Sequence, residues 1–318
     1  MCDIWKSETN RPFSLALLRP LLHSIRELKV RWIVLSGGEP LLNPELPELC
    51  SLLKKEGARL SLLTTGLLLA RRAEEIVRSF DDIIVSLDGP QPIHDRVRQV
   101  RGAFAVMQDG IAAIRRRRPS MRITARTTVQ KANHANLRQT VAAAKALGLD
   151  RISFLAADLT SEAFNHTIPW SETRQAQVGL SVEEVEALAD EIEAVVVEFR
   201  DEFQKGYIAE TPEKLRRIVC HFRAHLGLEQ PTSPRCNAPW VSAVIETDGL
   251  VRPCFFHKAI GTLQSASLTQ ILNSEQAGSF RAQLDIDSNP VCQRCVCSLN
   301  YRGVDVPSFT DLSQGSSE

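Results

Sequence analysis

Four cysteines in the last quarter of the sequence have the residue type and the spacing of a metal- or cluster-binding site. Cys236 and Cys254 flank the segment 241–252, which we expect to form a β-hairpin whose open end brings the two thiols together. Cys292 and Cys295 are separated by two residues and form a chelating pair. Four thiolates suit an iron–sulfur cluster or a structural zinc ion, and the spacing alone does not separate the two.

A second group of residues that could do chemistry is the tetrapeptide Gly37-Gly38-Glu39-Pro40, which follows an apolar run. The two glycines let a ligand approach the backbone closely. Glu39 places a carboxylate where a parallel strand is expected to end, which is where such sheets bind ligands. Together these residues could hold an ammonium group. An ordinary Gly-Gly turn with an exposed glutamate is the alternative that the tetrapeptide alone leaves open.

The elements that must position these residues alternate regularly over the first half of the chain. Five stretches are expected to form strands: 31–36, 60–63, 82–87, 122–129 and 151–155. Five segments have helical spacing of apolar residues: 15–28, 44–55, 70–80, 103–117 and 135–147. Strict alternation predicts a parallel sheet with helical crossovers. Because the sequence starts on a helix, we expect a first strand to be missing.

The regular alternation ends near residue 155. Residues 156–180 contain Pro169 and are predicted to form a loop. The part around 156–170 is expected to shape a substrate pocket together with the C-terminal cysteine region. Amphipathic helices are expected after Ser181, which begins a capping box, and after Thr211, which precedes a proline.

The combination of motifs in the first half of the sequence resembles the radical S-adenosylmethionine (radical SAM) enzymes. In that family Gly-Gly-Glu-Pro follows the second strand and holds the methionine amino group of the cofactor. Three further positions resemble the family pattern: Thr64 in a Thr-Thr-Gly turn, Ser86, whose counterpart contacts the cofactor ribose, and Arg126, whose counterpart commonly pairs with the cofactor carboxylate. The resemblance covers about residues 1–155 and implies an α/β fold, an incomplete (β/α)6 TIM-like barrel.

The same resemblance gives Cys2 a role. Radical SAM enzymes carry a C-x3-C-x2-C signature after the first strand, and its thiolates bind three irons of a [4Fe–4S] cluster. Residues 1–5 (MCDIW) resemble the end of that signature, which implies that Cys2 is the third ligand. We expect the other two cysteines and the strand before them to lie upstream of residue 1, as in a truncated reading frame. The alternative is a protein that has lost the radical chemistry.

The C-terminal cysteines resemble those of the twitch domain, a shorter relative of the SPASM domain in which four cysteines bind an auxiliary [4Fe–4S] cluster. With the upstream motifs, this resemblance favours iron–sulfur over zinc at Cys236, Cys254, Cys292 and Cys295. Cys297 is left over, as a substitute ligand or a bystander. The expected domains are a radical SAM core over 1–180, linking helices over 181–230, a small α+β cysteine-rich twitch domain over 231–303 and a disordered tail over 304–318.

The resemblance implies an oxidoreductase or modifying enzyme that uses a [4Fe–4S] cluster and S-adenosylmethionine to generate a 5′-deoxyadenosyl radical, which abstracts a substrate hydrogen. The auxiliary cluster would accept an electron from the substrate radical or position the substrate. A small molecule or a peptide is the expected substrate, and flavodoxin or ferredoxin the expected electron donor. The alternative from another class is a non-catalytic binding protein, stabilised by a cluster or zinc on a decayed barrel.

Composition argues against several other classes. Lys+Arg and Asp+Glu balance at 38 each, so no global field attracts nucleic acid or anionic lipid. The apolar runs are too short for a membrane span and no signal peptide is recognisable, which predicts a cytoplasmic protein. In that reducing compartment Cys50 and Cys220 are expected to be core residues of helices. His221 and His225, at i and i+4, are expected in surface or core roles rather than as metal ligands.

Overall fold

The computed structural model of the chain describes residues 12–161, 163 and 170–301. Its largest element is a parallel sheet of five strands in chain order. The strands are β1 (Trp32–Leu35), β2 (Arg59–Thr64), β3 (Asp82–Ser86), β4 (Arg122–Val129) and β5 (Arg151–Ala156). The predicted parallel α/β sheet is therefore confirmed.

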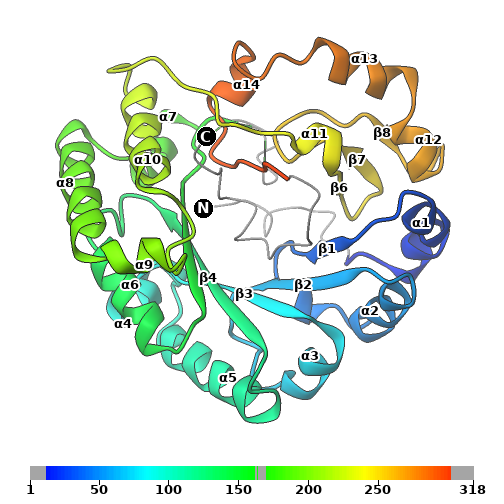
Figure 1. The fold of residues 1–318 in the computed structure, drawn as a ribbon, viewed down its shortest axis with the longest axis horizontal. Coiled ribbons are helices and arrows are strands. Elements are labelled where there is room, and N and C mark those ends of the chain that lie inside the picture. The colour runs from blue at the N-terminus through cyan, green and yellow to red at the C-terminus, as the bar shows by residue number, and fades with distance from the viewer. Residues whose placement is uncertain (1–11, 162, 164–169, 302–318) are drawn as a thin grey trace.

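Burial explains why these five segments form the centre of the fold. In β3, Ile83, Ile84 and Val85 are at most 1% exposed, as expected of parallel strands whose two faces are both covered. Figure 1 shows the sheet curving, with α2, α3, α5, α6 and α8 along its outer side. The helices of this half are α1 (Leu15–Glu27), the 3-10 helix η2 (Pro40–Leu42), α2 (Leu46–Lys55), α3 (Ala73–Ser79), α4 (Gln91–Arg98), α5 (Ala103–Arg117) and α6 (Leu137–Ala146).

The two edges of the parallel sheet differ. Beside β5 the chain returns at Ile208, which forms an isolated parallel bridge with Ile152. The N–H of Ile152 donates to the carbonyl of Tyr207, and the N–H of Ala209 donates to the carbonyl of Ile152, both at 2.8 Å. This short contact occupies the place of a further barrel strand. At the other edge, β1 pairs only with β2 within the described residues, so the expected strand before it stays a prediction.

Helices dominate the segment that follows the sheet. They are α7 (Glu172–Val178), α8 (Val182–Glu198), α9 (Arg200–Gln204) and α10 (Pro212–His225). The prediction of a loop throughout 156–180 is wrong at α7, whose first turn is capped by the Ser171 side chain. The expected capping box at Ser181 is present, since its hydroxyl accepts the N–H of Glu184 and the Glu184 carboxylate accepts the N–H of Ser181. α8 and α10 pack against each other beside β5.

A separate small antiparallel sheet follows and contains the C-terminal cysteines. Its strands are β6 (Val244–Ile245), β7 (Leu250–Arg252) and β8 (Gly261–Thr262), accompanied by α11 (Ala238–Val241), α12 (Leu268–Leu272), α13 (Glu275–Gln283) and α14 (Pro290–Gln293). The predicted hairpin is present as β6 and β7. Its turn requires glycine, because Gly249 has φ +85°. Its first arm is shorter than expected, since residue 241 ends α11 instead of starting a strand.

Figure 1 shows this second domain lying across the inner, concave side of the parallel sheet. Hydrogen bonds join α12 to α1, where the hydroxyl of Thr269 donates to the Glu27 carboxylate at 2.8 Å and its N–H meets Ser24 Oγ at 3.3 Å. None of the helices described here combines the length and apolar character needed to cross a bilayer. The tail predicted over 304–318 and Cys2 lie outside the described residues.

Candidate functional site

The loop after β1 is tied to the end of β2 through the carboxylate of Glu39. Both carboxylate oxygens accept from the Thr64 hydroxyl at 2.9 Å. One of them also accepts the N–H of Thr65 at 2.9 Å and its hydroxyl at 2.5 Å, and the other accepts the N–H of Leu41 at 3.2 Å. These four donors fill a carboxylate that has about four acceptor positions. Glu39 therefore positions the loop, and a ligand above the loop would meet backbone rather than this side chain.

The backbone around Glu39 has the conformation that its glycines allow. Gly37 has φ +130° and Gly66, which ends the Thr-Thr-Gly turn, has φ +87°; L side chains rarely adopt such angles. A Cβ at Gly66 would lie 2.7 Å from the Met107 side chain. Gly37 and Gly38 are exposed, and η2 starts at Pro40 with Glu39 as its N-cap. The sharp turn after β1 therefore presents bare backbone at the carboxyl edge of the sheet.

The other candidate residues of the barrel lie along the same edge. Ser86 ends β3 and is the register partner of Arg126 on β4, and Thr64, which ends β2, is the partner of Val85. Arg126 also acts electrostatically on a group outside the sheet, because it lowers the pKa of the Cys297 thiol against the rise that burial causes. The structure thus brings Glu39 to Thr64 and Ser86 to Arg126 at the carboxyl edge of the sheet.

All four predicted C-terminal ligands, Cys236, Cys254, Cys292 and Cys295, line one small cavity of about 30 Å³ with mostly apolar neighbours. The N–H of Ala238 donates to the sulfur of Cys236 at 3.4 Å. Nε2 of His257 lies 3.4 Å from the sulfur of Cys292. Hydrogen bonds to sulfur are among the groups that tune iron–sulfur clusters.

Burial makes three of these thiols poor acids. It raises the pKa of Cys292 to about 11 and the pKa of Cys295 well above its usual value. Burial also raises the pKa of Cys254, against the effect of hydrogen bonds from the N–H groups of Phe256 and His257. Thiolates in this cavity would need the positive charge of a metal or cluster, as is usual where metal binding is coupled to loss of protons.

The remaining cysteines of the described residues lie elsewhere. Cys297 lines a second, larger cavity and does not line the four-cysteine cavity. The thiol of Cys295 donates to the carbonyl of Cys297 at 2.9 Å. Cys50 is 1% exposed in α2, and burial raises its pKa to about 12, which confirms it as a core residue. Cys220 is half-buried in α10.

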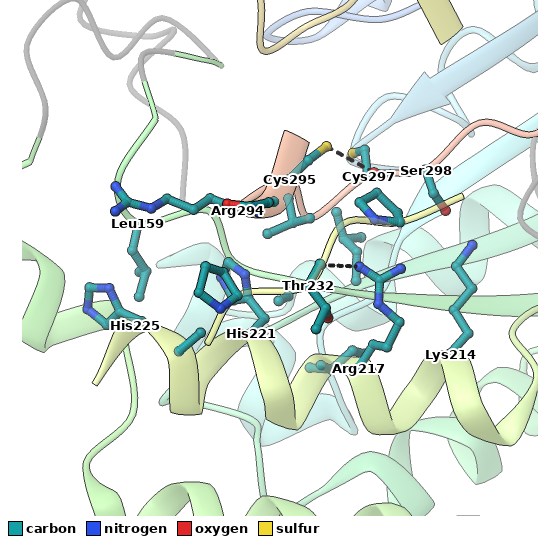
Figure 2. Close-up of a pocket in the computed structure, with 18 of the residues that line it drawn as sticks. Leu159, Lys214, Arg217, His221, His225, Thr232, Arg294, Cys295, Cys297 and Ser298 are labelled. Carbon is teal, nitrogen blue, oxygen red and sulfur yellow. Dashed lines mark hydrogen bonds between the residues drawn. The ribbon is translucent and has the colours of Figure 1, made fainter. Parts of the chain in front are cut away.

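The larger cavity, of about 330 Å³, lies between α10, the end of β5 and residues 293–298, as Figure 2 shows. His221 and His225 line it, and Nε2 of His221 lies 3.2 Å from the carbonyl of Ala157. Burial lowers the pKa of His221 to about 4 and also lowers the pKa of His225. Leu159 and Thr160, which follow β5, line this cavity together with residues 293–298 of the cysteine region. The substrate pocket expected from these segments stays a prediction.

Sequence reasoning missed the basic residues that line the larger cavity. Lys214 and Arg217 precede His221 and His225 on α10 at spacings of three, four and four. That is the period of one helix face. This spacing is visible in the sequence, but it does not by itself indicate a binding site, because the polar face of an amphipathic helix is ordinarily solvated.

Two family models match the chain. The radical SAM superfamily matches residues 1–144, and the iron–sulfur cluster-binding SPASM domain matches residues 236–296. Among curated relatives, the Fe-coproporphyrin III synthase of Methanosarcina barkeri is 28% identical over 151 residues, which cover 45% of this chain and 37% of the relative. The AdoMet-dependent heme synthase of that organism is 35% identical over 119 residues, 36% of this chain and 34% of the relative. The chain thus spans little more than a third of their length.

Solved structures share the fold over most of the chain. Native anSMEcpe with bound AdoMet has a TM-score of 0.63 at 16% identity and covers 92% of this chain and 82% of its own. Streptococcus suis SuiB bound to S-adenosylmethionine has a TM-score of 0.58 at 13% identity and covers 92% and 67%. Residues 1–144 thus match the radical SAM superfamily and residues 236–296 match the SPASM domain, and these two domains imply a core [4Fe–4S] cluster, S-adenosylmethionine and an auxiliary cluster.

Proposed function

We propose that the protein is a radical SAM oxidoreductase or modifying enzyme in which Cys236, Cys254, Cys292 and Cys295 hold the auxiliary [4Fe–4S] cluster. The observation that carries the proposal is the convergence of these four cysteines, from three separate parts of the chain, on one cavity. That cavity belongs to the domain that lies across the concave side of the sheet (Figure 1). A cluster there would be close to a substrate held over the barrel.

We favour a cluster over a single zinc ion because residues 236–296 match the iron–sulfur cluster-binding SPASM domain. Four thiolates suit either group. All four cysteines line one cavity, and in a cluster each thiolate would bind a different iron.

The carboxyl edge of the sheet supports binding of S-adenosylmethionine. The exposed backbone of Gly37 and Gly38, which Glu39 holds in place, can accept hydrogen bonds from the cofactor's amino group. Arg126 supplies a guanidinium group for the cofactor's carboxylate, which is a favourable charge-assisted pairing. Ser86, beside Arg126 on the neighbouring strand, supplies a hydroxyl for the ribose.

Cys2 would be one ligand of the core cluster, and it lies outside the described residues. Cys50 is unsuited to that role because it is packed inside α2. When bound, the core cluster and S-adenosylmethionine supply a 5′-deoxyadenosyl radical that abstracts a hydrogen atom from the substrate. Flavodoxin or ferredoxin would donate the electron in the cytoplasm, where we place the protein.

The names of relatives and structural neighbours indicate two sources of substrate. Two curated relatives are a heme synthase and an Fe-coproporphyrin III synthase, whereas SuiB has been seen with its precursor peptide SuiA. We therefore propose a tetrapyrrole or a peptide as the substrate. The auxiliary cluster would accept an electron from it or hold it in place.

Anaerobic reconstitution of the protein expressed from its complete reading frame tests the proposal. On reduction with dithionite, S-adenosylmethionine should be cleaved to 5′-deoxyadenosine. The Cys254→Ala protein should lose the auxiliary cluster and still cleave the cofactor, while Cys297→Ala should keep all its iron. Cluster binding without any 5′-deoxyadenosine would instead support the alternative of a non-catalytic binding protein, and iron lost from Cys297→Ala would make Cys297 a ligand.

A further inference from the structure

The larger cavity has walls suited to an organic ligand. It is distinct from the four-cysteine cavity, although Cys295 lines both. Leu155, Leu159, Ile218 and Val296 contribute apolar surface. A volume of about 330 Å³ is at the lower end for ligand pockets. The cavity can therefore take a small molecule or one part of a larger one.

Positive charge sets this cavity apart. Lys214 and Arg217 from α10 and Arg294 from the cysteine region line it, and no Asp or Glu is among the described residues that do. Figure 2 shows Lys214 and Arg217 side by side at one end, while Arg294 reaches toward the opposite end. The cations are thus spread along the cavity instead of meeting at one point.

Two buried carboxylates behind the lining compensate only part of this charge. Glu210 attracts Lys214 and accepts the N–H of Phe154 at 2.9 Å. Burial raises the pKa of Glu210, which favours the neutral, protonated carboxyl group over the carboxylate. Asp158 accepts the N–H of Ser161 at 3.3 Å and also its hydroxyl. Both carboxylates are therefore engaged by the protein's own backbone.

The two cations on α10 are held in an unfavourable environment. Burial lowers the pKa of Lys214, and the nearby guanidinium groups of Arg126 and Arg217 lower it further, against the attraction of Glu210. Burial also lowers the pKa of Arg217. Nε of Arg217 is buried and finds no hydrogen-bond partner among the described residues, and one terminal nitrogen donates to the carbonyl of Thr232 at 3.0 Å. An anion in the cavity would relieve the repulsion between these cations.

We propose that this cavity binds the carboxylate groups of a substrate whose framework is apolar. The inference rests on the proposed function, since it says which chemical groups of the proposed substrate bind between the barrel and the SPASM domain. Planar guanidinium groups match carboxylates. Because Arg294 reaches toward the opposite end of the cavity from Lys214 and Arg217 (Figure 2), carboxylates at several points fit these cations better than a single phosphate. Propionate groups of a tetrapyrrole and acidic side chains of a peptide offer the same chemistry.

Binding measurements on the whole protein, with the C-terminal cluster reconstituted and S-adenosylmethionine omitted, test this inference. The probes are coproporphyrin III against its methyl ester, followed by fluorescence, and a Glu-containing peptide against its Gln counterpart, followed by calorimetry. The variants are Arg217→Met and Lys214→Met. Arg216→Met is the matched control, because Arg216 is the neighbour on α10 that pairs with Glu193 on the exposed face.

We expect Arg217→Met and Lys214→Met each to weaken binding of an acid probe by about 10- to 100-fold, as loss of a charge-assisted hydrogen bond does. Arg216→Met should change it by less than about twofold. Binding of only the porphyrin or only the peptide supports the inference and identifies the source of the carboxylate. Esters or amides that bind as tightly as acids, variants that bind like wild type, or no binding of either acid would overturn it.

Circular dichroism of the three variants shows whether each is folded, and Lys214→Arg should restore most of the affinity if the positive charge is what matters. The readout does not involve radical chemistry. Failure here with 5′-deoxyadenosine still formed would remove the inference and leave the proposed function. Binding of an acid probe by a protein that forms no 5′-deoxyadenosine would keep the carboxylate-binding inference and remove the proposed radical SAM function.

Discussion

The barrel and the C-terminal domain hold their candidate sites in different ways. Behind the carboxyl edge of the barrel lies a sheet whose strands are packed on both faces, with Leu60, Leu62 and Val85 fully inaccessible. The strands of the C-terminal domain have only two or three residues. Apart from Pro239 and Pro253, the buried apolar residues described between 236 and 301 are Ala238, Val251, Ile260, Leu268, Ile271 and Ala277.

This difference indicates what each site depends on. A parallel sheet with a large core can keep Thr64, Ser86 and Arg126 in register without any ligand, because apolar burial stabilises it. The C-terminal domain has too little apolar surface for that, so bonds from its cysteines to a cluster would supply much of its order, as in other small metal-bound domains.

The largest expected effect comes from breaking the cysteine site. Cys254→Ala should abolish the auxiliary cluster and speed amide hydrogen exchange over residues 236–300, while exchange in the five-stranded sheet stays slow. Cys50→Ala is the control, because Cys50 packs in the barrel core and is expected to leave the iron content unchanged. Retained iron in Cys254→Ala, or loosening that spreads to the sheet, would contradict the contrast between the two domains.

Breaking the barrel core should do the opposite. Leu62→Ala removes a fully buried side chain from β2 and should lower the free energy of unfolding by about 2–5 kcal/mol, measured with urea. The auxiliary iron content of the folded protein should not change. Leu42, which is 70% exposed, gives the control, and its change to Ala should cost less than about 0.5 kcal/mol. If Leu62→Ala lowered the free energy of unfolding by less than about 0.5 kcal/mol, core packing would not be what positions the barrel site.

The loop after β1 should respond to its single carboxylate. Glu39→Ala removes the acceptor of the Thr64 and Thr65 hydroxyls, so the loop loses its attachment to β2. The affinity for S-adenosylmethionine should fall by about 1.5–3 kcal/mol, measured by calorimetry on the anaerobically reconstituted protein. Glu48→Ala, which removes an exposed pair with Arg19, is the control and should have little effect. If Glu39→Ala and Glu48→Ala both bound S-adenosylmethionine as tightly as the wild type, the Gly-Gly-Glu-Pro motif would be only a turn.

The smallest predicted effect concerns pH at the contact between α10 and the end of β5. The pKa of His221 is about 4 in the folded protein and near 6.5 when unfolded, so its stabilising contribution is present above pH 6.5 and is lost as the pH falls toward 4. His221→Gln keeps a donor for the carbonyl of Ala157 but cannot titrate. The loss of unfolding free energy between pH 7 and pH 5 should therefore be about 1–2 kcal/mol smaller in this variant. Equal pH dependence in both proteins would refute the prediction.

Sequence patterns were sufficient for the parallel sheet because strand-like and helical stretches alternate regularly, and several strands contain an apolar run such as Ile83-Ile84-Val85. They were insufficient where elements are short or polar. β8 has two residues and no period to detect, and α7 (ETRQAQV) has a single buried residue, Val178, so no apolar face marks it as a helix. The length of an element and the number of its buried apolar residues therefore decide whether it can be predicted from the sequence.

The candidate sites show the same limit. Cys236 and Cys254 could be paired in advance because a local hairpin joins them. The hydrogen bonds from Thr64 and Thr65 to Glu39 could not be predicted from the sequence, since they connect two loops that only the register of β1 and β2 brings together. The basic lining of the larger cavity likewise depends on how α10 docks beside β5 and the cysteine region.

The central claim is that Cys236, Cys254, Cys292 and Cys295 bind a [4Fe–4S] cluster, and an iron count with Mössbauer spectroscopy tests it most directly. The measurement uses the Cys2→Ala protein, reconstituted anaerobically, so that the iron reports the C-terminal cysteines alone. The account predicts a brown protein with about four irons per chain and the spectrum of a [4Fe–4S] cluster. A colourless protein that holds a single zinc ion per chain would contradict it.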